Sequence, residues 1–333
     1  MVNTSNIKKM KLSYSLGSLL SIEEVLECSQ KLNEIKPEVI WIPETWGMEN
    51  FSMLGIISKQ NKFSKIGSSI INIYSRSPSL IAMGAATVDT ISKGRLILGL
   101  GTSSIPIIED FHGQPFESPV QRMKEYVDII RLVLSGEKIN YSGKIFSLKD
   151  FSLLVKPLRK EIPIYFAAIN KKMVELTWDI ADGVIFYLRP KDEMKKIIPY
   201  MQKTRKIDIS LQIITCVDHD YEKAINRAKK TLSFYIAVGT IYREFLHSNG
   251  YSEEIEIIYN EYKKNGLENL EKFIPDKMLD DLCIAGTPDT AVKKLNVFRS
   301  IGIDLPIIQF NPIGDVKKSF ELLTNTFSGG LNE

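Results

Sequence analysis

Histidine and cysteine are the residue types whose chemistry is easiest to recognise from spacing. The three histidines, His112, His219 and His247, form no HExxH pattern, and no cysteine stands at a zinc-finger spacing from them. The three cysteines are scattered without a CxxC pair, which indicates free thiols in a reducing cytoplasm. We therefore expect no metal centre and no disulfide framework.

Other polar and aromatic side chains that could bind a ligand or take part in catalysis stand directly after short apolar runs. Glu44 follows the second of these runs along the chain, and a carboxylate in a pocket can orient a ligand or exchange a proton. A loop carboxylate can equally cap a helix or form a salt bridge, so the spacing alone leaves the role of Glu44 open. The full set is Glu44, Thr45 and Trp46; Ser69, Ile70, Asn72 and Arg76; Gly101, Thr102 and Ser103; Ala167, Ala168, Ile169, Asn170 and Lys171; Tyr187 and Arg189; and Gln309 and Asn311.

The composition narrows the ligands that these residues would bind. The chain has 333 residues, is 44% hydrophobic and 25% charged, and carries a formal net charge of +3. A nearly neutral chain argues against binding to nucleic acid or a membrane surface, which needs clustered Lys and Arg. No run approaches the roughly 20 apolar residues that span a bilayer, and the stretch from Lys8 to Leu20 lacks a signal-peptide cleavage site. We expect a cytoplasmic protein with a small-molecule substrate.

Eight apolar runs are predicted to be the strands that position these residues. Several are rich in Ile and Leu without clean alternation, which is typical of parallel strands covered on both faces by helices. The runs are Met10–Gly17, Val39–Pro43, Lys65–Asn72, Arg95–Gly101, Ile162–Ala168, Gly183–Tyr187, Ile207–Val217 and Leu305–Asn311.

Amphipathic stretches with helix start and stop signals separate the strands. Ser21-Ile22-Glu23-Glu24 is a capping box, and Ser77-Pro78, Ser118-Pro119 and Thr287-Pro288 place proline in the first turn of a helix. Glycine ends the helices that start at Pro78 and Pro119. Repeated strand–helix units of this kind predict a parallel α/β fold.

The pattern predicts one (β/α)8 TIM barrel with insertions, spanning residues 1–333 as a single domain. Residues 138–148 are expected to form an inserted β-hairpin, and residues 218–281 a helical insertion before the last strand. In such barrels the reactive groups lie at the carboxyl ends of the strands. We therefore expect the polar residues named above to meet at one mouth.

The residues then show a resemblance to a known family. Ordered motifs carry it from about residue 10 to 312: WIPETWG at 41–47, GSSIINIYSRSP at 67–78, GRLILGLGT at 94–102, HGQPFESP at 112–119, ADGV at 181–184 and GTP at 286–288. The chain resembles the bacterial-luciferase-like superfamily, and within it the oxidoreductases that use coenzyme F420, such as methylenetetrahydromethanopterin reductases.

The resemblance implies a flavin-type ring bound at the barrel mouth, with hydride transfer at its central carbon. It implies a non-proline cis peptide bond between Ser69 and Ile70, in a bulge that supports one face of the ring. Glu44 would be the acidic residue near the reactive part of the ring, as a catalytic group. Thr45 stands where several family dehydrogenases have histidine, which argues against a mechanism in which that histidine transfers a proton.

The remaining site residues also follow from the resemblance. Trp46 would be a pocket wall, whereas Trp178 is expected in the helix core, and Asn72 would either contact the ring or make a turn. His112 is expected to be structural, and Ser103 or Ser104 in place of a family glutamate argues against a sugar phosphate. The cofactor phosphate would meet the backbone of Gly101, Thr102 and Ser103 and of Ala167, Ala168, Ile169, Asn170 and Lys171.

The resemblance therefore predicts a coenzyme F420-dependent oxidoreductase. Two alternatives stay open: an FMN-dependent monooxygenase, because the two cofactors share a phosphorylated tricyclic ring, and a non-catalytic protein that binds a flavin or deazaflavin. Homodimers are common in the family, so we expect one here.

Overall fold

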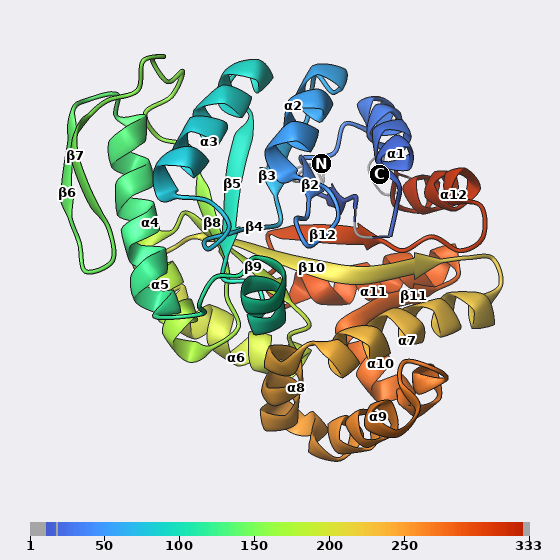
Figure 1. Ribbon diagram of the computed structural model, residues 1–333. Helices are drawn as coiled ribbons and strands as arrows, with labels where there is room; N and C mark the ends of the chain where they lie inside the picture. The colour runs from blue at the N-terminus through green and yellow to red at the C-terminus, as the bar shows by residue number, and fades with distance from the viewer. Residues whose placement is uncertain (1–10, 18, 329–333) are drawn as a thin grey trace, which may run out of the picture.

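A closed barrel of eight parallel strands forms the centre of the molecule (Figure 1). The computed structural model describes residues 11–17 and 19–328, so Met10, at the start of the first predicted strand, lies outside the described residues. Around the barrel the strands are β1 (Ser13–Ser15), β2 (Val39–Ile42), β3 (Lys65–Ser68), β5 (Leu96–Gly101), β8 (Ile164–Ala167), β9 (Gly183–Tyr187), β10 (Asp208–Val217) and β12 (Leu305–Phe310). The pairing of β12 with β1 and of β9 with β10 closes the ring and confirms the predicted (β/α)8 fold.

Two short strands join the same sheet without being members of the ring. The predicted third strand is split into β3 and β4 (Ile71–Asn72), and β4 pairs with the end of β5. The second, β11 (Cys283–Gly286), pairs with Ile214–Val217 of β10, past the residues of β10 that pair with β9. We did not predict β11, because its four residues follow a helix directly and show no alternation that marks a strand.

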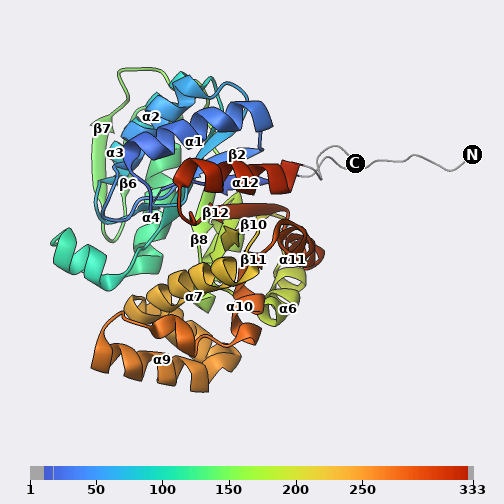
Figure 2. The same cartoon turned by 90° about the vertical axis from the view of Figure 1, so that its right-hand side faces the viewer.

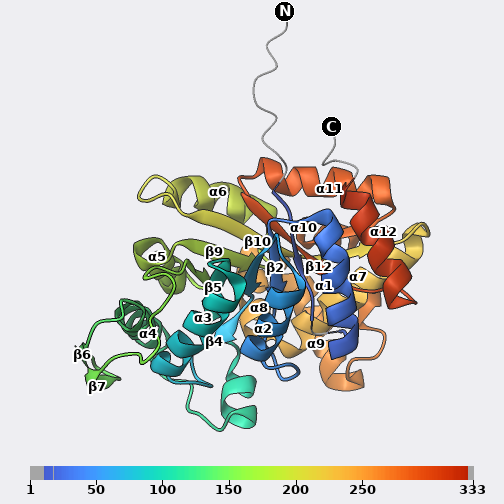
Figure 3. The same cartoon turned by 90° about the horizontal axis from the view of Figure 1, so that it is seen from above.

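Helices cover the outer face of the barrel, as the view from above shows (Figure 3). The capping box of Ser21 and Glu24 starts α1, and the Ser77 hydroxyl accepts the Leu80 N–H at the start of α3, so both predicted starts are correct. The covering helices are α1 (Ile22–Ile35), α2 (Asn50–Gln60), α3 (Pro78–Ser92), α4 (Pro119–Leu134), α5 (Lys171–Ile180), α6 (Lys191–Met201), α11 (Pro288–Ser300) and α12 (Val316–Ser328).

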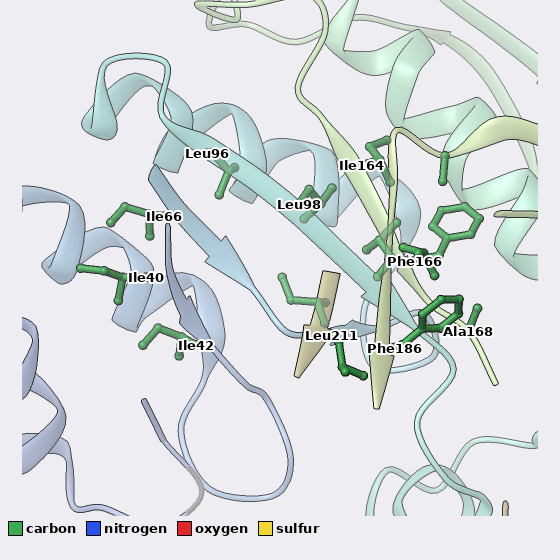
Figure 4. Close-up of a cluster of buried hydrophobic side chains, with 14 of the residues drawn as sticks. Ile40, Ile42, Ile66, Leu96, Leu98, Ile164, Phe166, Ala168, Phe186 and Leu211 are labelled. Atoms are coloured by element: carbon green, nitrogen blue, oxygen red, sulfur yellow. The ribbon is translucent and has the colours of Figure 1, made fainter. Parts of the chain in front are cut away.

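The barrel strands bury side chains on both faces, which explains their continuous apolar sequences. On the inner face the Trp41 ring occupies the space beside Gly67, where a Cβ atom would lie 2.4 Å from the ring, so a larger residue at position 67 would displace the ring. The indole N–H donates to the Ser13 hydroxyl at 3.0 Å. Figure 4 shows side chains of the layer between strands and helices, among them Ile40, Ile42, Ile66, Leu96, Leu98, Ile164 and Phe166.

A β-hairpin lies between α4 and β8, where the sequence predicted one. It consists of β6 (Ile139–Ser142) and β7 (Ser147–Phe151), so its second strand runs three residues further than predicted. The buried carboxylate of Glu125 on α4 accepts N–H bonds from its turn; the donors are Lys144, Ile145 and Phe146. Burial raises the pKa of Glu125, but these bonds and one from Gln121 lower it overall, so the ionised carboxylate anchors the hairpin.

A second group of helices interrupts the chain between β10 and β11. In Figure 2 these helices form a layer on one side of the barrel. They are α7 (Tyr221–Val238), α8 (Thr240–Leu246), α9 (Ser252–Asn265) and α10 (Asp276–Leu282), with short η2 (His247–Tyr251) and η3 (Leu270–Phe273) turns. Within the described ranges, no helix has the length and apolarity needed to cross a membrane.

Candidate active site at the barrel mouth

A cavity of about 610 Å³ opens at the carboxyl ends of the barrel strands. Its walls come from the loops after β2, β3, β5 and β8, from β9 and β10, and from α7 and α8 of the helical insertion. This is the volume range of small-molecule and cofactor sites in proteins. The position agrees with the rule that reactive groups of such barrels lie at the carboxyl ends of the strands.

Most of the residues expected at the mouth line this cavity, but six do not: Asn72, Arg76, Ala168, Arg189, Gln309 and Asn311. Ala168 is buried in the core. Asn72 uses its amide oxygen to accept the N–H groups of Tyr74 and Ser75 at 3.0 and 2.8 Å, which is the turn-forming role. The members of the predicted set that line the cavity are Glu44, Thr45, Trp46, Ser69, Ile70, Gly101, Thr102, Ser103, Ala167, Ile169, Asn170, Lys171 and Tyr187.

The segment between β3 and β4 forms one wall of the cavity. The peptide bond between Ser69 and Ile70 is cis. Just before it, the Ser68 hydroxyl accepts the Gly99 N–H at 2.8 Å and donates to the Gly99 carbonyl at 2.9 Å, which joins β3 to β5 through a side chain. Ser69 and Ile70 are thereby held at the cavity surface, with the Ser69 hydroxyl buried and without a hydrogen-bond partner among the described residues.

Glu44 belongs to a partly buried ion pair. Both of its oxygens accept from the Arg76 guanidinium, at 2.6 and 2.8 Å, and Oε1 also accepts the Asn50 N–H at 3.1 Å. The side chains are 8% and 14% exposed, and hydrogen bonding to Glu44 raises the pKa of Arg76. Arg76 also contacts the Glu49 carboxylate, which caps α2. Glu44 thus lines the cavity with both carboxylate oxygens already occupied by donors from the protein.

The start of α5 supplies donors to another part of the cavity. Asn170 is the N-cap residue, but its side chain makes no capping hydrogen bond. The first N–H groups of the helix therefore remain available as hydrogen-bond donors. Asn170, Lys171, Lys172 and Met173 all line the cavity. The Arg189 guanidinium donates to the Ile169 carbonyl at 2.5 Å and fixes the preceding loop. Free N–H groups and a helix dipole are suited to bind an anion.

The helical insertion contributes aromatic side chains that sequence reasoning did not place in the site. Tyr235 on α7 and Tyr242 on α8 line the cavity beside Tyr187, which ends β9. The three rings pack edge to face, with centroids 5.1 to 6.0 Å apart. The sequence carries no motif around these two insertion residues, because only the tertiary fold brings α7 and α8 to the mouth.

With this geometry in view, the chain can be compared with known proteins. The family model for luciferase-like monooxygenases matches residues 7–305. This chain belongs to that family. A 5,10-methylenetetrahydromethanopterin reductase from Archaeoglobus fulgidus is 32% identical over 298 residues, which cover 85% of this chain and 88% of the relative.

Solved structures show the same fold at lower identity. The coenzyme F420-dependent tetrahydromethanopterin reductase from Methanopyrus kandleri superimposes with a TM-score of 0.85 at 22% identity, covering 97% of this chain and 99% of the other. An F420-dependent secondary alcohol dehydrogenase in complex with an F420–acetone adduct gives 0.78 at 18%, with 96% and 98% covered. These neighbours share the barrel of this luciferase-like protein over almost its whole length.

Three further predictions for this luciferase-like chain concern single side chains. Trp46 lines the cavity and is 58% exposed, so its ring stands at the rim. Trp178 is buried in α5 and stacks on Phe186, as expected of a core residue. His112 does not line the cavity, and its Nε2 atom lies 3.5 Å from Asn72 Nδ2, which agrees with the structural role that we expected.

Proposed function

We propose that this chain is a coenzyme F420-dependent oxidoreductase, which transfers a hydride between the deazaflavin ring and an organic substrate. The observation that carries the proposal is the 32% identity with a methylenetetrahydromethanopterin reductase over 85% of the chain. The cavity at the barrel mouth supports it, since that is where a family member would hold its ring. By the same likeness, the substrate would resemble a methylene-carrying tetrahydropterin.

The residues of the cavity fit a planar ring with a phosphorylated tail. Its walls are mainly apolar, and the buried Ser69 hydroxyl without a partner would be satisfied by a polar group on the ring. The free N–H groups at the start of α5, with Lys171 and Lys172, would hold the phosphate. Gly101, Thr102 and Ser103 contribute to the same wall from the end of β5.

Bound coenzyme would supply the carbon that carries the hydride, and the protein would supply position and electrostatics. Ser69 and Ile70 would support one face of the ring from the β3–β4 segment. Glu44 would orient the ring through its fixed negative charge. We favour this role over proton transfer, because Arg76 and Asn50 occupy both Glu44 oxygens.

The proposal predicts preferential binding of F420 over FMN. Purified protein titrated separately with the two cofactors should bind F420 with a Kd of about 1 µM or lower and FMN at least about tenfold more weakly, a difference of roughly 1.4 kcal/mol. Oxidation of reduced F420 with 5,10-methylenetetrahydromethanopterin as acceptor measures turnover.

Two outcomes of these experiments would count against the proposal in different ways. Micromolar FMN binding without F420 binding, together with oxygen consumption by reduced FMN, would identify a monooxygenase instead. Tight F420 binding without turnover of any substrate in a broad panel would identify a binding protein.

Substitution of Lys171 and Lys172 by Met should weaken F420 binding. The loss of affinity relative to the unsubstituted protein should be larger at low salt than at high salt, because the contact with the phosphate is electrostatic.

We also propose that the chain forms a homodimer in the cytoplasm. Exposed apolar side chains on the adjacent helices α2 and α3 support self-association: Ile56, Leu80 and Met83 are each 44% to 50% exposed. The three cysteines are buried and unpaired, as is usual in a reducing compartment. Light scattering of the purified protein would give its mass, and a monomeric mass would contradict the dimer.

A further inference from the structure

One end of the cavity lies across the barrel from the residues proposed to hold the coenzyme ring. In the order β1, β2, β3, β5, β8, β9, β10, β12, strands β9 and β10 stand four places from β2 and β3. Glu44 follows β2 and Ser69 follows β3, whereas Tyr187 ends β9 and Gln212 lies in β10. All four line the same cavity, so the two groups face it from opposite walls.

The wall formed by β9 and β10 carries two buried polar atoms without partners. Tyr187 Oη and Gln212 Oε1 are inaccessible to solvent, and no described residue lies within 3.5 Å in hydrogen-bond geometry, although the Tyr235 hydroxyl is near enough to Tyr187 to raise its pKa. The other amide atom of Gln212, Nε2, donates to Gln309 Oε1 at 3.2 Å, which fixes the side chain and leaves its oxygen as an acceptor. Buried polar groups of this kind are costly unless something binds them.

This wall is also aromatic and uncharged. Tyr235 and Tyr242 complete it from the insertion, and burial raises the pKa of all three tyrosines, so their hydroxyls stay protonated and able to donate. Of the side chains that line the cavity, Glu44, Lys171 and Lys172 are charged; Glu44 is paired with Arg76, and the lysines belong to α5. A neutral ligand therefore suits this end.

The geometry points to a substrate subsite at Tyr187 and Gln212 for a neutral, planar heterocycle with a lactam edge, that is, a ring C=O beside an N–H. The Tyr187 hydroxyl would donate to the carbonyl, Gln212 Oε1 would accept from the N–H, and Tyr235 and Tyr242 would pack around the ring. This inference rests on the proposed function, because a coenzyme ring supported by Ser69 and Ile70 leaves the opposite wall to the substrate. A pterin has such an edge.

Two substitutions that keep the size of the side chain test the subsite. Tyr187→Phe removes only the hydroxyl and Gln212→Met removes the amide, and each should raise the KM for 5,10-methylenetetrahydromethanopterin roughly tenfold, the loss expected for one hydrogen bond. The Kd for F420 should change less than about twofold. Tyr200→Phe, at an exposed position on α6, is the matched control and should change neither value.

Distinct outcomes separate this inference from the proposed function. Unchanged KM in both variants would overturn the subsite, and so would weaker F420 binding with unchanged KM, which would assign the lactam edge to the coenzyme. Tetrahydromethanopterin should also be titrated into the protein with and without F420. Pterin binding that both substitutions weaken supports the subsite even if F420 fails to bind, whereas absence of pterin binding overturns it even if F420 binds.

Discussion

Replacing Gly99 by alanine is expected to abolish coenzyme binding and to lower the free energy of unfolding by about 3 kcal/mol or more. A Cβ atom on residue 99 would lie 1.9 Å from the Ser68 carbonyl oxygen. That oxygen belongs to the backbone, so no side-chain rotation relieves the clash, and β3 must move away from β5. The movement would break both hydrogen bonds between the Ser68 hydroxyl and Gly99, which hold the wall at Ser69 and Ile70.

Urea denaturation and F420 titration measure the two effects of Gly99→Ala. The matched control is Gly55→Ala in α2, where a Cβ atom would meet nothing within 4 Å. There alanine should raise the stability by up to about 1 kcal/mol, because glycine is a poor helix former. Ser68→Ala should weaken F420 binding less than Gly99→Ala, since it removes the bridge without a clash. A Gly99→Ala protein with wild-type stability and F420 affinity would show that the β3–β4 segment tolerates displacement.

Local sequence signals were sufficient for the barrel but not for every strand. Continuous apolar runs and helix caps such as Ser21 and Ser77 depend on interactions within a few residues. The runs located the eight barrel strands, and the caps located the helices between them. The short strand β11 depends on pairing with β10 past the end of β9, which is a long-range contact. The break between β3 and β4 is also absent from the periodicity, and only the family motif indicated it.

The candidate site likewise contains residues that the sequence could predict and residues that depend on tertiary contacts. The residues after β2, β3, β5 and β8 could be predicted, because the carboxyl ends of parallel strands must meet. Tyr235 and Tyr242 could not, since nothing in their neighbourhood shows that α7 and α8 turn back over the mouth. The partner of Glu44 was also missed: Arg76 is 32 residues away, and its guanidinium reaches Glu44 only once α3 packs beside α2.

Replacing Arg76 by methionine is expected to destabilise the protein by about 1–3 kcal/mol, the range for leaving a polar group without its partner, because the ion pair with Glu44 is only partly buried. Among the described residues, Glu44 would keep the Asn50 N–H as a donor, and Glu49 would lose its contact with the guanidinium. Glu44→Gln should cost less, because Arg76 keeps Glu49. The double variant Glu44→Gln with Arg76→Met should recover part of the loss, since it leaves neither charge of the pair unpaired. Urea denaturation of the three variants completes a double-mutant cycle, and additive effects would contradict the coupling.

The same variants decide what Glu44 contributes to hydride transfer. If the carboxylate orients the ring, Glu44→Gln should weaken F420 binding about tenfold and lower kcat by less than about tenfold, with the pH profile of kcat unchanged. If Glu44 instead moves a proton, kcat should fall about 10²–10⁴-fold at saturating F420, and one limb of the pH profile should disappear. Glu49→Gln is the matched control, because Glu49 also contacts Arg76 but does not line the cavity. We expect the first pattern, because both oxygens of Glu44 are already occupied by donors from the protein.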